Sequence, residues 1–135
     1  MHYFIESILL GAYSLFVYTF LHIFSFKNMQ NKYALLFVVG FCKHLFGYLF
    51  YFHTLYCNYG YACNKSTQYK KSKYSNILLF ESLIEGFMYV FLGIILGLIV
   101  KNQYIIYFSI GCILHLMSEI LQLHDYFCRK RCVLL

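Results

Sequence analysis

Four long apolar segments, separated by three polar gaps, dominate the pattern along the chain. They run near 3–24, 33–52, 76–100 and 103–123. Each has the roughly 20 residues that an α-helix needs to cross the hydrocarbon core of a bilayer. The segments are continuously apolar instead of alternating, which favours helices over the strands of a membrane barrel. Because two of the gaps are short, the pattern predicts an all-α integral membrane protein made of two helical hairpins.

The composition supports a membrane environment. Of the 135 residues, 61% are hydrophobic and 12% are charged, and the mean hydropathy is +0.63. A soluble domain carries roughly 25% charged residues and buries a smaller apolar surface. The first segment has Glu6 where a signal peptide has basic residues, and no clear small-residue cleavage site follows, so we expect it to be retained as a span.

The two hairpins resemble copies of one unit. The pattern Glu-Ser-x-x-x-Gly occurs at 6–11 and at 81–86, and the pattern His-x8-His-x3-Cys occurs at 44–57 and at 115–128. Such a repeat predicts two parallel copies related by an approximate two-fold axis along the membrane normal, with a site at their interface. It is also compatible with a homo-oligomeric ancestor and a homo-oligomer. The resulting units are the first hairpin, a basic loop, the second hairpin and a basic tail, at 1–57, 58–75, 76–128 and 129–135.

The basic residues predict the orientation. With four spans, the middle loop and the tail lie on the same side as the N-terminus. That side has Lys65, Lys70, Lys71, Lys73, Arg129, Lys130 and Arg131, and the other has Lys27, Lys32 and Lys101. Because cytoplasmic loops carry the excess of Lys and Arg, we expect both termini in the cytoplasm. The net charge of +6 predicts attraction to anionic lipid head groups, and nucleic-acid binding is not expected without a soluble module.

The acidic residues lie inside the apolar segments instead of the polar gaps. Ionisable groups within spans are costly and usually face a bundle interior or a wet cavity. The helical rise gives the depth of each ionisable residue in the bilayer. Four of them, one from each segment, lie at the same depth near the cytoplasmic face and form a first layer. Two others form a second layer one helical turn deeper. The first layer is Glu6, His53, Glu81 and His124, and the second is Glu85 and Glu119.

These six residues are the candidate site. Imidazole and carboxylate together suit zinc, iron or manganese, and carboxylates at close range also share protons. A metal-binding or proton-relaying role in transport is one hypothesis. The bundle resembles di-iron four-helix proteins only in part, because their Glu-x-x-His turn is missing. The alternative is a non-catalytic scaffold of a viral or organellar membrane, in which the polar layer only fixes helix pairing.

A haem held between His44 and His115 is a further arrangement to test. The second histidine of each segment follows nine residues later, at His53 and His124, and is therefore about 180° away around the helix. Two haems stacked between the same helices would need both histidines of each helix on one face. The spacing therefore allows only a single haem, held between His44 and His115.

The cysteines support two further interpretations. Cys57 and Cys128 each follow a histidine by four residues, so a Cys2His2 zinc site between the hairpins is conceivable. Structural disulfides are not expected in a reducing cytoplasm. A small membrane oxidoreductase using metal or thiols is the third hypothesis. The chain is similar to quinone-linked disulfide-forming enzymes and vitamin K epoxide reductases in span number, but it lacks their C-x-x-C pair.

The last four residues, Cys132-Val133-Leu134-Leu135, fit a C-a-a-X box that a final leucine directs to geranylgeranyl transfer. The basic residues before it and Cys128 as a palmitoyl acceptor complete a tail that looks like those of small GTPases. If Cys132 is prenylated, it cannot be a metal ligand. No nucleotide-binding, nucleophile-elbow or zinc-protease motif occurs, so the sequence indicates neither a standard hydrolase nor a reaction.

Overall fold

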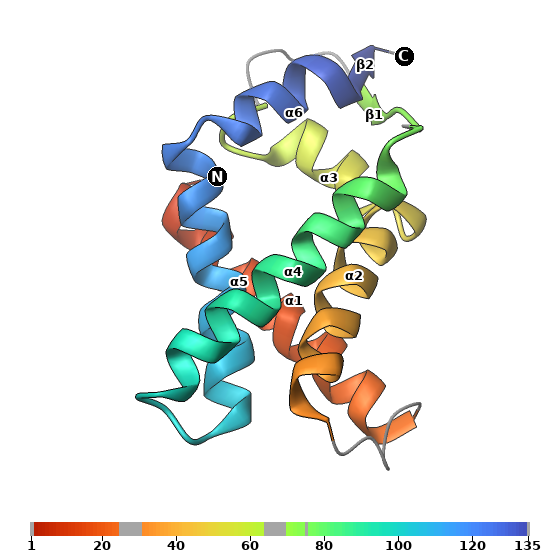
Figure 1. Ribbon diagram of the computed structural model, residues 1–135. Helices are drawn as coiled ribbons and strands as arrows, with labels where there is room; N and C mark the ends of the chain where they lie inside the picture. The colour runs from red at the N-terminus through yellow and green to blue at the C-terminus, as the bar shows by residue number, and fades with distance from the viewer. Residues whose placement is uncertain (1, 25–30, 64–69, 75, 135) are drawn as a thin grey trace.

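The computed structural model describes residues 2–24, 31–63, 70–74 and 76–134, which form four long helices closed at one end by two short ones (Figure 1). The long helices are α1 (Tyr3–Phe24), α2 (Lys32–Leu49), α4 (Leu78–Gly97) and α5 (Gln103–Ile120). The short helices are α3 (Phe52–Tyr59) and α6 (Leu123–Arg131). The long helices are all long and apolar enough to cross a membrane, so the four predicted helices are confirmed. Lys27, Lys65 and Leu135 lie outside the described residues.

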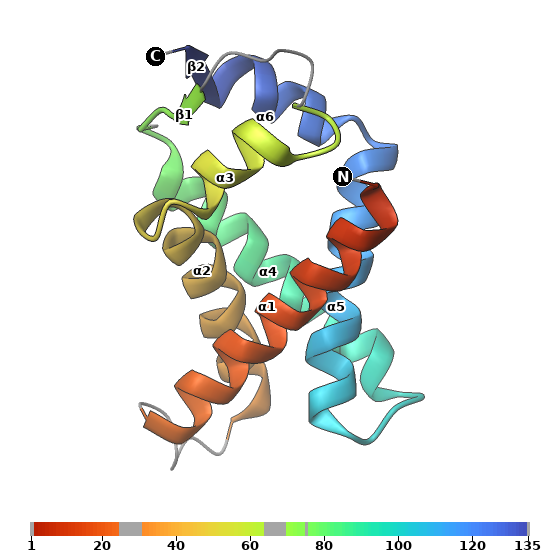
Figure 2. The same ribbon diagram turned by 180° about the vertical axis from the view of Figure 1, so that it is seen from behind.

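Helices α3 and α6 cross the same end of the bundle at which both described termini lie (Figures 1 and 2). There β1 (Lys70–Ser72) pairs antiparallel with β2 (Cys132–Leu134), the last described residues of the chain. We call α3, α6 and this two-stranded sheet the cap. Two disulfides join its parts, Cys57–Cys132 and Cys63–Cys128.

The cap exists because the second and fourth predicted segments end earlier than expected. Tyr51 (φ 64°) and Gln122 (φ 60°) adopt the left-handed conformation, which ends α2 and α5 and turns the chain into α3 and α6. Neither residue is the glycine or asparagine that usually marks such a turn. The predicted spans therefore extend to Phe52 and Leu123, which instead begin the short helices.

The same features recur at corresponding positions of the two halves. Asn31 and Asn102 cap α2 and α5 with side-chain oxygens that accept from two backbone N–H groups each, an interaction that stabilises helix starts. Both capped helices have 18 residues. Each ends two residues before one of the left-handed residues, and a short helix of the cap follows that residue.

The helices pack mainly between hairpins, α1 against α5 and α2 against α4. Glycines permit both close approaches. A Cβ on Gly111 would lie 2.7 Å from the Leu10 carbonyl oxygen, and one on Gly40 would lie 2.8 Å from that of Glu85. Backbones that approach this closely need small residues at the crossing, as they do between packed membrane helices. The two helix pairs are thus fixed at their crossings.

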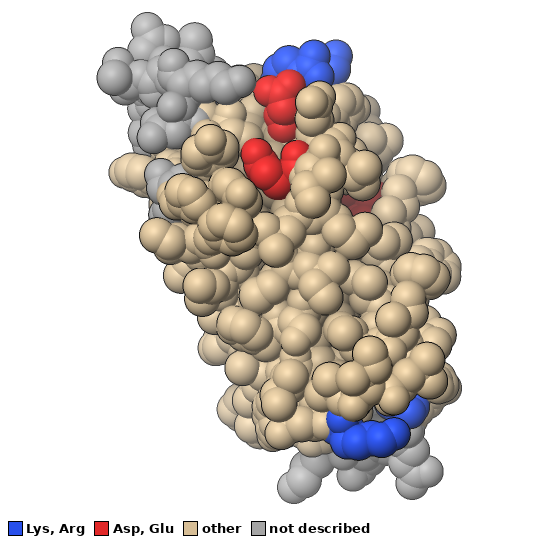
Figure 3. All heavy atoms as spheres, turned by 90° about the vertical axis from the view of Figure 1, so that its left-hand side faces the viewer, with Lys and Arg blue, Asp and Glu red and all other residues tan. Residues whose placement is uncertain are grey.

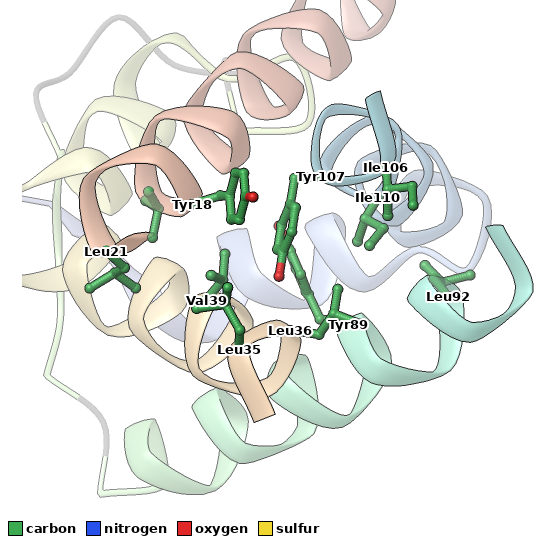
Figure 4. Packing of buried hydrophobic residues seen from close by; sticks show 11 residues of the cluster. Tyr18, Leu21, Leu35, Leu36, Val39, Tyr89, Leu92, Ile106, Tyr107 and Ile110 are labelled. Atoms are coloured by element: carbon green, nitrogen blue, oxygen red, sulfur yellow. The ribbon is translucent and has the colours of Figure 1, made fainter. Parts of the chain in front are cut away.

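The buried core fills the part of the bundle away from the cap (Figure 4). Tyr18 and Tyr107 stack with ring centroids 4.0 Å apart, and the hydroxyl of the fully buried Tyr89 shares a 2.6 Å hydrogen bond with Ser14. Many large apolar side chains lie outside this core and are exposed. In Figure 3 a broad belt without charged side chains separates the basic residues at the two ends of the bundle.

Candidate functional site

Between the two helix pairs and beneath the cap lies a cavity of about 920 Å³. This volume is at the upper end of the roughly 300–1,000 Å³ typical of ligand pockets. Two clusters of hydrogen-bonded polar residues contribute to its lining, one from α2 and α4 and one from α1, α5 and α6. Acidic side chains are visible in a recess near the cap end of the surface (Figure 3).

The first cluster, here called the Lys43 cluster, joins α2, α4 and the tail. Lys43 Nζ donates to Glu85 Oε1 at 2.6 Å, and His44 Nδ1 lies 2.8 Å from Glu85 Oε2. His44 Nε2 lies 3.2 Å from Glu81 Oε2, and Arg131 contacts the other oxygen of Glu81. Since a carboxylate only accepts hydrogen bonds, a histidine bridging two of them is satisfied as the imidazolium. The cluster then has three cations for two carboxylates.

The second cluster, the His115 cluster, joins α1, α5 and α6 and contains no Lys or Arg. His115 Nε2 lies 3.0 Å from Glu6 Oε2, and Glu6 also accepts from the backbone N–H of Tyr61. His124 Nδ1 lies 2.8 Å from Glu119 Oε2, and the rings of His115 and His124 have centroids 4.3 Å apart. Burial lowers the pKa of His124, and the hydrogen bond to Glu119 only partly opposes this effect.

His53 and Tyr56 of α3 line the cavity between the two clusters. His53 packs edge-on against His44, with ring centroids 5.2 Å apart, and no described carboxylate bonds to it. Burial, and then the positive charge of His44, lowers the pKa of His53 to about 4, so it is neutral at pH 7. The Tyr56 hydroxyl is buried without a hydrogen-bond partner among the described residues, and burial raises its pKa. Both side chains are therefore neutral groups with hydrogen-bonding capacity to spare.

The structure distributes the six candidate residues differently from the predicted layers. Glu81 and Glu85 belong to the Lys43 cluster, whereas Glu6, Glu119 and His124 belong to the His115 cluster. His53 forms no hydrogen bond with a described residue of either cluster. The predicted layers assume that the second and fourth segments are uninterrupted helices. Instead, the turns at Tyr51 and Gln122 fold the parts that carry His53 and His124 across the cavity.

Sequence reasoning missed four participants. Lys43 and Arg131 are the cations of the first cluster, and His44 and His115, considered as haem ligands, instead hydrogen-bond carboxylates. The pairing of Lys43 with an acid could have been predicted, because a lysine in the middle of an apolar segment requires an acidic partner nearby. The pairing of Arg131 could not, since nothing in its sequence neighbourhood indicates that the tail returns to α4.

The expectation of reduced cysteines is not met. Cys57 is bonded to Cys132 and Cys63 to Cys128, and sulfurs in disulfides are neither thiolate ligands for zinc nor thiols for prenyl or palmitoyl transfer. Among the described residues, no group of three or more His, Cys, Asp or Glu has an arrangement that could hold a metal ion.

The chain matches no known protein family, and no curated protein and no solved structure is significantly similar to it.

Lys43 and Glu85 offer a test of whether the first cluster only holds helices together. At the corresponding positions the other half has Leu114 and Leu10. We expect Lys43→Leu or Glu85→Leu alone to destabilise the fold by about 3–5 kcal/mol, since each removes one member of a buried ion pair and leaves the other. The double variant Lys43→Leu/Glu85→Leu should recover most of this loss. Unfolding by sodium dodecyl sulfate in mild-detergent micelles measures these differences, and a double variant as unstable as the single ones would contradict the expectation.

Proposed function

We propose that the protein is a multi-pass membrane protein that binds an amphipathic molecule, dissolved in the bilayer, in the cavity beneath the cap. The observation that carries the proposal is the continuity of the cavity lining with the outer surface. Leu9, Phe80 and Ile84 line the cavity and are also 51%, 61% and 47% exposed. In a bilayer these side chains would border the lipid, so an apolar chain could enter sideways.

The polar groups inside the cavity favour a neutral head group. The charged side chains of the lining, Glu6, Glu81, Glu85, Lys43 and Arg131, each have a hydrogen-bonded partner within their cluster. A charged ligand would have to displace one of these partners. His53 and Tyr56 carry the unused hydrogen-bonding capacity, and both are neutral. A hydroxyl or carbonyl head group suits them because it needs no counter-charge.

We also propose that the fold arose by duplication of one hairpin. The shared helix caps, the two left-handed turns and the glycine crossings are what an approximate two-fold axis relating the halves would produce. The His44–Glu81 and His115–Glu6 hydrogen bonds also correspond, and so do the two disulfides. A site between the copies follows from such an arrangement.

Photolabelling tests the ligand proposal. A diazirine-bearing palmityl alcohol should label wild-type protein in lipid nanodiscs on peptides that line the cavity, more strongly than the matching fatty acid or amine. Met88→Trp fills the cavity and should abolish this labelling. Phe91→Trp, on the same helix but exposed and outside the lining, should leave it unchanged. Equal labelling of all three proteins would reject the cavity as the binding site, and the polar clusters would then serve only to pair the helices.

The second candidate function is binding of a divalent transition metal at the His115 cluster. Two histidines and two glutamates gather there without a lysine or arginine to repel a cation, whereas the Lys43 cluster carries three cationic groups. The ligand types suit zinc, iron or manganese. Chelation would require the His115 and His124 side chains to rotate from their present partners toward one centre.

Metal content tests this candidate. If the site binds metal, purified protein should contain near-stoichiometric zinc, iron or manganese by plasma mass spectrometry, and His124→Ala should lose it. His53→Ala, the corresponding residue of the first half, is the control and should retain the metal. Absence of metal from wild-type protein purified without chelators would remove the candidate.

We propose that the cap faces an oxidising compartment. Disulfides persist in the secretory lumen, the periplasm or outside the cell and are rare in the cytosol. The Lys and Arg distribution favours the opposite orientation, but it is a statistical tendency that other features override. Disulfide formation depends directly on the redox chemistry of the compartment. We therefore base the orientation on the two disulfides and not on the Lys and Arg distribution.

Glycosylation reporters test the orientation. A tag carrying an Asn-x-Ser site would be fused after Leu135 or inserted within 25–30, in a chain with Asn64→Gln to remove the acceptor at 64–66. In a eukaryotic host we expect a glycosidase-sensitive mass shift for the C-terminal tag and none for the inserted tag. The reverse pattern would put both termini in the cytoplasm, as the charge distribution predicts.

A further inference from the structure

The two disulfides of the cap lie side by side. Cys63 Sγ, in one bridge, is 3.8 Å from Cys132 Sγ, in the other. Thiol–disulfide exchange proceeds by attack of a thiolate on a disulfide sulfur. A thiolate generated at Cys63 would therefore lie in contact with a sulfur it can attack. Two disulfides that serve only to close loops have no need of this proximity.

The surroundings of the four cysteines favour one order of attack on the two disulfides. Cys57 and Cys63 are 0% and 2% exposed, whereas Cys128 and Cys132 are partly exposed. An external thiol reaches the Cys63–Cys128 bridge most readily at Cys128, and Cys63 is then the leaving group. Lys70 Nζ donates to the Cys63 carbonyl oxygen at 2.7 Å, so a positive charge lies beside this residue. Cationic neighbours stabilise thiolates, which favours both the departure of Cys63 and its survival as a nucleophile.

Backbone hydrogen bonds hold the Cys57–Cys132 disulfide next to Cys63. Cys132 opens β2 and is paired with Ser72 of β1, and the Lys73 backbone N–H donates to the Arg131 carbonyl oxygen at 2.7 Å. These backbone bonds hold Cys132 independently of its disulfide. Cys57 belongs to α3, so its release does not require the strand pairing to break.

We propose that the two disulfides form an exchange-coupled pair that accepts two electrons from an external dithiol and rearranges to a single Cys63–Cys132 disulfide. The external thiolate attacks Cys128 Sγ, which forms a mixed disulfide and expels the Cys63 thiolate. Cys63 attacks Cys132 Sγ and expels the Cys57 thiolate. The second external thiol resolves the mixed disulfide and releases Cys128. The external dithiol leaves as a disulfide, and its two protons remain on Cys57 and Cys128.

This activity does not depend on the proposed ligand in the cavity. Its partner class is a reduced dithiol, either a small molecule or a cysteine pair of another protein, which would be oxidised at the cap. The half-buried cysteines of the helical bundle, Cys42 and Cys112, are free thiols and take no part in the exchange.

Limited reduction of the wild-type protein tests the rearrangement. The protein in detergent would be treated with substoichiometric dithiothreitol, quenched with N-ethylmaleimide, digested and mapped by mass spectrometry. We expect the two-electron-reduced species to carry alkylated Cys57 and Cys128 and a Cys63–Cys132 linkage. A reduced species that keeps a native bridge, Cys57–Cys132 or Cys63–Cys128, would overturn the proposal.

Two single substitutions form a matched pair. Cys63→Ser and Cys128→Ser remove the same disulfide, but only Cys128→Ser leaves a thiol beside Cys132. We expect Cys57 to become alkylated without added reductant in Cys128→Ser and to stay protected in Cys63→Ser. Equal protection of Cys57 in both variants would mean that Cys63 does not attack the second bridge. Should either variant fail to fold, the wild-type mapping still decides the question.

Discussion

The cost of placing carboxylates in apolar helices is the constraint on which the rest of this structure depends. An ionised group in a low-dielectric interior is tolerated only if charge or hydrogen bonds compensate it. Glu85 meets this requirement with Lys43 and His44, Glu81 with His44 and Arg131, and Glu6 with His115. Each compensating bond runs between helices of different hairpins or from the tail to a helix. The same interactions that neutralise the acids therefore hold the two halves of the chain together.

The cavity follows from where these bonds and the glycine crossings lie. The crossings bring backbones into contact in the middle of the bundle, at Gly40 and Gly111. Nearer the cap the helices carry the Lys43 and His115 clusters, whose charged side chains do not fill the space between the helices as the tyrosines and aliphatic side chains of the core do. The left-handed turns at Tyr51 and Gln122 then lay α3 and α6 across the open end. The outcome is a cavity beneath the cap whose mostly apolar lining contains the two polar clusters.

Hydrophobic pattern alone predicted the four long helices, because continuous apolar segments of spanning length have few other solutions. It could not predict the cap, since no glycine or proline marks the turns at Tyr51 and Gln122. The residues of the site were partly predictable. Acids in apolar segments identified Glu6, Glu81 and Glu85, but their partners depend on helix rotation and on the path of the tail, neither of which a linear pattern contains.

The two halves share a scaffold but differ in chemistry. Glu85 and Lys43 form an ion pair where the other half has Leu10 and Leu114, while Glu119 bonds to His124 where the first half has Tyr48 beside an unpaired His53. A polar layer that only paired helices could use the same residues in both halves. Instead, one polar cluster of the cavity is rich in cations, the ionisable groups of the other are histidines and glutamates, and the neutral groups His53 and Tyr56 lie between them. This asymmetry gives a bound molecule distinct surroundings at its two sides, which a symmetric bundle could not provide.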